Sequence, residues 1–218
     1  AFALPFLKFD DPVLESSRCE VFWRTGDRRA SACLEGLDSK KLSKSAWFMK
    51  HINAKGQPTG KSTQWSKLSS GAMSIPGFEL AYARKLLSEG QINAAIRAYT
   101  RAILQDSSTA TPQTVFELER LFISHKRRYE GTRKFEEIIE TAVRLKRSPS
   151  LLGSLHLAVA RIYQPEAAHS MARRHLGSAI DYLGETPEII ELIVRYYEAK
   201  DKPIQTRMWQ NKLKKFHD

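Results

Sequence analysis

Long hydrophobic runs are scarce in this 218-residue chain. Hydrophobic residues make up 42% of it, which is ordinary for a globular protein with a buried core. No stretch approaches the roughly 18 consecutive apolar residues that a transmembrane helix requires. The sequence therefore predicts no membrane-spanning helix, and its length suits one large domain or two small ones.

Cysteine is also scarce, since Cys19 and Cys33 are the only two in the chain. A pair separated by a short polar segment is typical of a disulfide in an exported protein, so we expect these two to be bonded. The alternative is two free thiols in a reducing compartment. The chain begins at Ala1, and residues 1–7 suit a start left by a removed signal peptide, which favours an exported, periplasmic protein. A trimmed chain and a mitochondrial protein with a removed transit peptide are the alternatives.

Motifs for catalysis, metal binding and nucleotide binding are missing. Residues 56–62 resemble a phosphate-binding loop, but Lys55 stands where its first glycine belongs and no buried strand precedes it. No Gly-x-Ser-x-Gly elbow is present. No histidine has a partner at helical i, i+4 spacing that would complete a metal site; the six are His51, His125, His156, His169, His175 and His217. The sequence predicts a non-enzymatic protein with no metal and no cofactor.

Acidic residues are fewer than basic ones. The chain has 24 Asp and Glu and 35 Lys and Arg, which gives a net charge of +11 and a pI near 9.7. This excess favours an anionic partner. The charge is spread over the whole chain, unlike that of a basic nucleic-acid-binding arm. Short basic runs such as residues 126–128 lie where helices are expected to end, which complements the helix dipole. Aromatic residues suitable for stacking RNA bases are not evident between them, so RNA binding is the less favoured alternative.

Residues 1–76 are predicted to form an irregular segment with little α or β structure, because glycine and proline interrupt its short apolar groups. Residues 21–23 have strand-like composition and are expected to pair with residues 32–34 across a Gly-Asp turn. Residues 40–52 are predicted to form an amphipathic helix, and residues 53–76 a linker with Trp65 as its large anchor. The aromatic residues of this segment are expected to cover one end of the domain that follows; a partner-binding patch is the alternative. They are Trp23, Trp47, Phe48 and Trp65.

From residue 77 onward the apolar positions follow the 3.6-residue period of amphipathic helices. Breaks at Gly90, Ser148-Pro149 and Gly184 divide this region into helix pairs. We therefore expect an all-α domain over residues 77–218. The four predicted pairs are residues 78–87 with 92–104, 113–126 with 133–145, 151–163 with 165–183, and 187–199 with 203–216.

The segment 90–106 resembles the second helix of a tetratricopeptide repeat, a helix pair with small residues where its helices touch. The residues that carry the resemblance, including those of a lengthened middle repeat of about 40 residues, are Ala83, Ala95, Tyr99, Ala102, Phe135, Ile139, Ala142, Ala160, Tyr163, Ala172, Leu176 and Ala179. The resemblance implies an α-α solenoid of about four helix pairs. It also implies a peptide-binding face on the first helices and no chemistry of the repeats' own.

Arginines recur at equivalent first-helix positions if the repeats are aligned in this way. They are Arg84, Arg161 and Arg195, with Arg120 or Arg127 filling the gap in the second repeat. A series of guanidinium groups suits carboxylates, so we expect an acidic peptide or a C-terminal carboxylate as ligand. The alternative is a self-neutralised face, because the last repeat places Glu188, Glu191 and Glu198 on the same side.

Two functions from different classes follow from these features. The first is a protein–protein interaction scaffold or assembly factor within a larger complex, in an exported cell-envelope machine such as a pilus, flagellum, secretion or polysaccharide system. The second is a basic helical-repeat protein of an organellar ribosome or RNA-processing complex. The repeat pattern, the cysteine pair and the chain start favour the first.

Overall fold

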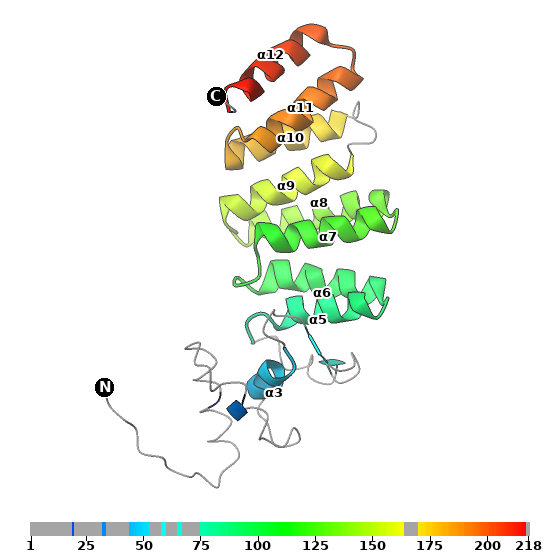
Figure 1. Ribbon diagram of the computed structural model, residues 1–218, viewed down its shortest axis with the longest axis vertical. Coiled ribbons are helices and arrows are strands. Elements are labelled where there is room, and N and C mark those ends of the chain that lie inside the picture. The colour runs from blue at the N-terminus through cyan, green and yellow to red at the C-terminus, as the bar shows by residue number, and fades with distance from the viewer. Residues whose placement is uncertain are drawn as a thin grey trace, which may run out of the picture. The chain divides into compact units, whose positions relative to one another are not determined.

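The computed structural model describes residues 19, 32–33, 44–52, 58–59, 65–66, 75–163 and 170–216 (Figure 1). Within these residues the secondary structure is helical, apart from one isolated bridge between Ile52 and Pro58. The expected all-α class is therefore confirmed for this part of the chain. The chain divides into two compact units, Ala1–Ala98 and Tyr99–Asp218. The boundary at residues 76 and 77 stays a prediction from the sequence.

The first unit contains helices α3 (Lys44–Lys50) and α5 (Phe78–Ser88) and the start of α6 (Ile92–Gln105). Aromatic rings join α3 to α5. Trp65 is fully buried, with its ring 5.8 Å from that of Phe48 and 5.6 Å from that of Phe78, and its Nε1 donates to the Thr59 carbonyl over 2.9 Å. Trp65 is thus the anchor that the sequence predicts, and the aromatic residues cover α5. Trp23 lies outside the described residues.

Cys19 and Cys33 form a disulfide with their Cα atoms 5.5 Å apart, which confirms the predicted bond. The strand predicted around it is wrong where it can be seen, because Ala32 and Cys33 have helical backbone. Alanine favours helix, and a three-residue apolar group is too short for its composition to decide. The proposed partner strand, residues 21–23, lies outside the described residues.

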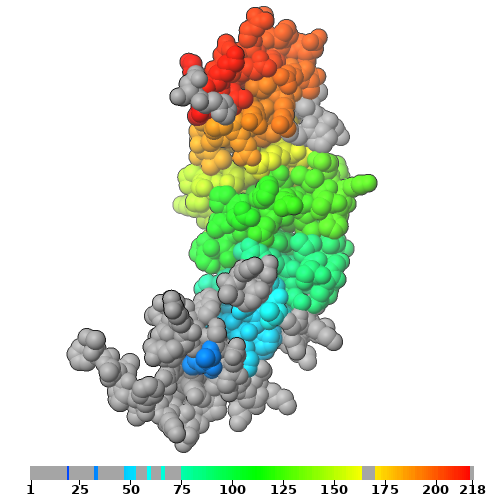
Figure 2. All heavy atoms as spheres, in the orientation of Figure 1, coloured from blue at the N-terminus to red at the C-terminus, as the bar shows by residue number. Residues whose placement is uncertain are grey.

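The second unit is a helical repeat-like array. After the end of α6 it contains α7 (Pro112–Ser124), α8 (Arg128–Arg144), α9 (Pro149–Ile162), α10 (Ser170–Leu183), α11 (Pro187–Ala199) and α12 (Pro203–Lys214). Helix α9 packs against α7, α8 and α10, and α11 packs against α10 and α12. Figure 2 shows that, on the face drawn, side chains fill the spaces between these ribbons. None of the described helices has the length and apolar character needed to cross a bilayer.

Three helices of this unit begin in the same way. Thr111, Ser148 and Thr186 are N-caps whose hydroxyl oxygens accept the backbone N–H three residues later, and each is followed by a proline in the first turn. Proline suits this position because its missing N–H would have no partner there. The three caps recur at nearly equal spacing along the sequence, so α7, α9 and α11 begin at equivalent positions of successive helix pairs.

Small residues permit the close contacts between helices. Ala160 of α9 and Ala172 and Ala179 of α10 are buried, as the resemblance predicts. At Gly153 of α9, a Cβ atom would come within 2.4 Å of the Leu183 side chain on α10. The glycine therefore sets how closely these two helices approach.

Most predicted helices are found within a few residues of their expected bounds, but α8 begins at Arg128 rather than at residue 133. Gly131, inside its first turns, looks like a helix breaker in the sequence. Its role is steric, because a Cβ there would lie 2.9 Å from the Phe122 side chain. Helix α10 is described from Ser170, so the predicted start at Pro165 lies outside the described residues.

Candidate partner-binding groove

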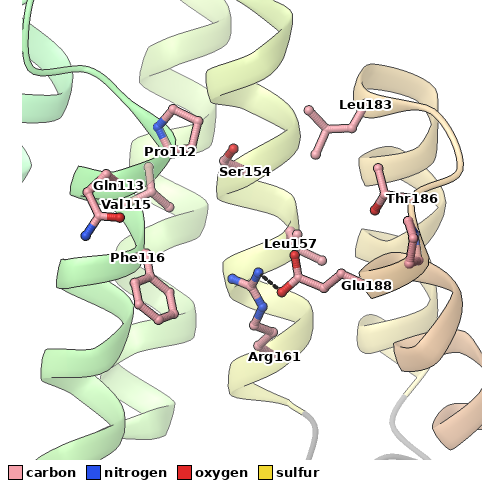
Figure 3. Close-up of a pocket in the computed structure, with 11 residues that line it drawn as sticks. Pro112, Gln113, Val115, Phe116, Ser154, Leu157, Arg161, Leu183, Thr186 and Glu188 are labelled. Carbon is pink, nitrogen blue, oxygen red and sulfur yellow. Dashed lines mark hydrogen bonds and ion pairs between the residues drawn. The ribbon is translucent and has the colours of Figure 1, made fainter.

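The first helices of three successive pairs, together with Leu183 at the end of α10, line a groove of about 650 Å³ in the second unit. Most of its lining is apolar, and the residues are Pro112, Gln113, Val115, Phe116, Ser154, Leu157, Arg161, Leu183, Thr186, Pro187 and Glu188. Figure 3 shows Phe116 of α7 on one side, Arg161 of α9 between the walls, and Glu188 of α11 turned toward Arg161. The shared cap-proline start of α7, α9 and α11 brings these side chains to one face.

Arg161 connects the three helices. Its Nη1 donates to Glu119 Oε2 of α7 over 2.7 Å, and its Nη2 donates to Glu188 Oε1 of α11. Its guanidinium also lies 5.9 Å from the centre of the Phe116 ring, within the range of a cation–π interaction. One cation therefore holds two carboxylates and borders the aromatic side of the groove.

The two carboxylates lie in different surroundings. The Glu119 side chain is 3% exposed and that of Glu188 is 55% exposed. Burial raises the pKa of Glu119 to about 7, because desolvation outweighs the attraction of Arg161. Burial lowers the pKa of Arg161, but the two carboxylates raise it by more, so the net shift is upward and the guanidinium stays charged.

A second, more polar hollow of about 550 Å³ shares Arg161 and Glu188 with the groove. Arg128, Glu191 and Arg195 also line it. Arg161 and Arg195, two of the arginines selected from the sequence, thus lie in one hollow together. Arg128 is not among the arginines that the sequence predicts for partner binding, and its Nη1 donates to the Ile162 carbonyl over 3.2 Å.

The other selected arginines lie elsewhere. The Arg120 guanidinium is 5.8 Å from the Phe116 ring centre, next to the groove. Arg127 binds Glu130 on the first turn of its own helix, with Nε donating to Oε2 over 2.7 Å. Arg84 belongs to the first compact unit. Their role in partner binding stays a prediction.

The acidic residues of the alternative interpretation also separate. Glu188 does pair with Arg161, as a self-neutralised face requires, and Glu191 lines the same hollow. Glu198 instead accepts a bond of 3.2 Å from the Gln210 side chain of α12. Phe116 and Glu119 were not predicted from the sequence. The periodicity of the apolar residues in α7 could have indicated Glu119, because it places this carboxylate on the buried face between Leu118 and Phe122.

A second titratable cluster joins α9 to α10. His156 Nδ1 and His175 Nδ1 are 2.9 Å apart, a hydrogen bond in which one ring donates to the other. The His156 ring also stacks on Tyr182, with centroids 5.8 Å apart, and His175 Nε2 lies 4.0 Å from Glu136 of α8. Burial lowers the pKa of both histidines, and that of His175 falls to about 4. Both rings are therefore neutral at pH 7.

The histidine pair does not extend to a metal site. Among the residues that the structure describes, no group of three or more His, Cys, Asp or Glu side chains is arranged to hold a metal ion. The Nδ1 atoms are also closer than the roughly 3.3 Å expected for two nitrogens that share a tetrahedral ion at 2.0–2.1 Å. The geometry is that of a direct hydrogen bond.

Comparison of the whole chain with protein-family models, with curated proteins and with solved structures finds no match.

Proposed function

We propose that this chain is a non-enzymatic interaction scaffold or assembly factor that binds a peptide segment of a partner protein in the groove formed by α7, α9 and α11. The observation that carries the proposal is the groove itself, an open apolar hollow crossed by the charged Arg161. Apolar walls with a few fixed polar groups are typical of ligand sites. Arg and aromatic residues such as Phe116 are enriched at protein interfaces.

A TPR-like solenoid of about four helix pairs is part of the same proposal. It is supported by the burial of the small residues that carry the resemblance, such as Ala95, Ala102 and Ala179, and by the evenly spaced caps that start α7, α9 and α11. Such scaffolds bind partners on extended surfaces made from successive repeats.

We place this scaffold in an exported cell-envelope machine, such as a pilus, flagellar, secretion or polysaccharide system. The support is the disulfide between Cys19 and Cys33, since disulfides persist in oxidising compartments. A removed signal peptide, a periplasmic location and membership of a larger complex follow from the same proposal.

Site-specific photo-crosslinking in the source cells tests the groove. A photoreactive amino acid at Gln113, an exposed position on the groove wall, should crosslink a cell-envelope protein. The same amino acid at Glu140, an exposed position on α8, serves as the matched control and should give no such product. Crosslinks of equal yield from both positions, or none from either, would argue against a partner in the groove.

A second function, RNA binding in an organellar ribosome or processing complex, is favoured by one side chain. Tyr129 at the start of α8 is 85% exposed, and Arg133, one turn further, has a side chain that is 75% exposed. An exposed aromatic ring beside basic residues suits the stacking of RNA bases. The exposure of Tyr129 was not predicted from the sequence. Anisotropy of a labelled single-stranded RNA should then show binding that weakens with salt and with Tyr129→Ser. No binding near physiological salt would remove this function.

A further inference from the structure

The two carboxylates on Arg161 are not equally replaceable. Glu119 lies beneath the guanidinium and away from solvent, so separating it from Arg161 would leave a buried charge without a partner. Glu188 reaches the same guanidinium from the groove edge, and more than half of its side chain is exposed. Exposed ion pairs of this kind contribute little net free energy. A carboxylate arriving from solvent would therefore replace Glu188 and leave Glu119 in place.

An apolar hollow adjoins the position that Glu188 occupies. Phe116, Leu157 and Leu183 line it from three helices, and the Phe116 side chain is partly exposed although it is large and aromatic. A ligand that places an apolar side chain there covers this surface. Because Glu188 and Arg161 line the same groove, a carboxylate close to that apolar side chain in the ligand would reach the guanidinium.

The polar hollow becomes more positive when Glu188 leaves, because one of its three carboxylates is removed while its three arginines stay. Arg128, Arg161 and Arg195 line the polar hollow, opposed by Glu191 and by the buried Glu119. Burial of Glu119 favours its protonated form, which weakens its opposition near neutral pH. The hollow without Glu188 is therefore positive, and its charge complements an acidic residue rather than a basic one.

We propose that the groove takes a peptide segment in which an Asp or Glu lies close to a large apolar residue, and that Glu188 occupies the Arg161 position until the ligand's carboxylate displaces it. The inference rests on the proposed function, since it specifies the peptide that the groove binds. Glu188 competes with the ligand's carboxylate for the Arg161 guanidinium. A carboxylate alone gains little by displacing it, so Glu188 favours ligands that also make an apolar contact in the groove.

The probe is a phage-displayed library of random peptides selected on the full chain, with Phe116→Ser used to reject peptides that bind elsewhere. One selected peptide is then synthesised twice, with its acidic residue intact and with the matching amide. We expect the amide to bind more weakly, by about tenfold, because it loses the charge-assisted bond to Arg161. Glu188→Gln should tighten binding of the acidic peptide by about two- to fivefold and leave the amide peptide unchanged.

Glu198→Gln is the matched control, because it makes the same charge change on the same helix while Glu198 contacts α12 instead. It should alter neither affinity. Selected peptides that depend on Phe116 but bind equally well as acid and amide, or that ignore Glu188→Gln, would overturn the inference alone. A library that yields no Phe116-dependent peptide would overturn the proposed groove function, and the inference with it.

Discussion

Acid should weaken the second unit through the hydrogen-bonded pair of His156 and His175. In the folded chain both rings are neutral at pH 7, and burial lowers the pKa of His175 from its ordinary value of 6.5 to about 4. The unfolded chain therefore takes up a proton at a higher pH than the folded chain does. Stability is unaffected well above pH 6.5, falls as the pH drops below it, and stops falling below about pH 4.

The size of this effect follows from the shift. A difference of one pKa unit corresponds to 1.36 kcal/mol, so the free energy of unfolding should fall by about 2 kcal/mol at pH 5 and about 3 kcal/mol at pH 4 from His175 alone. His156 adds a loss of the same sign, because burial and Arg174 lower its pKa while Asp181 opposes them. On the third helix at this cluster, the carboxylate of Glu136 in α8 faces His175, with Oε1 4.0 Å from Nε2.

Urea unfolding followed by circular dichroism at pH 7.5, 5 and 4 measures this loss in the wild type and in His175→Gln. The variant cannot titrate, so its deficit relative to the wild type should shrink by about 3 kcal/mol between pH 7.5 and pH 4. Ser178→Ala, three residues along α10, changes no titrating group and should keep a constant difference from the wild type. A deficit of His175→Gln that stays the same at all three pH values would refute the reasoning.

Three further predictions concern packing, the ion pair and the disulfide. Gly153→Ala should destabilise the protein by about 1–3 kcal/mol in urea unfolding, because the new Cβ meets a leucine side chain; Gly177→Ala on α10, which meets no atom closer than 3.4 Å, should be neutral or stabilising. Arg161→Gln should lower the free energy of unfolding at pH 8 by about 3 kcal/mol, because it leaves the Glu119 carboxylate buried and unpaired. Adding Glu119→Gln should restore part of the lost stability. A double variant that is no more stable than Arg161→Gln would contradict this prediction. The native protein should incorporate a thiol reagent, measured by mass, only after reduction, and alkylation of both cysteines without reductant would exclude the bond.

The helices of the second unit were predictable because their signals are local. Apolar periodicity, prolines in first turns and Gly184 at a helix end each act within one helix, and α7, α9 and α11 begin close to where these signals place them. The early start of α8 was not predictable, because Gly131 has two opposing effects: it lowers the local helix propensity, but it allows α8 to pack closely on the preceding helix. Its missing side chain weakens an isolated helix, yet it removes a clash with Phe122 of the helix before it.

The histidine pair shows why contacts between helices escape this kind of reasoning. A search for ligands or partners at i, i+4 examines one helix at a time, whereas His156 and His175 lie on α9 and α10. Their meeting depends on how closely those helices approach, which Gly153 and the buried alanines determine. The sequence contains these residues, but their consequence for the two rings is set by three-dimensional packing.

The arginines illustrate the same limit for the candidate groove. The sequence predicts that Arg161 and Arg195 are equivalent cations on one face and offers Arg127 as a candidate for the gap between repeats. The choice between a ligand-binding face and a self-neutralised face depends on which carboxylates these arginines contact. The structure distinguishes them by environment, since Arg127 binds a glutamate on its own helix while Arg161 and Arg195 line a common hollow. Arg161 also has two kinds of partner, one buried and one exposed, so self-neutralisation and ligand binding are compatible at this residue. The buried partner fixes the guanidinium in place, and the exposed partner is the one that a ligand can exchange.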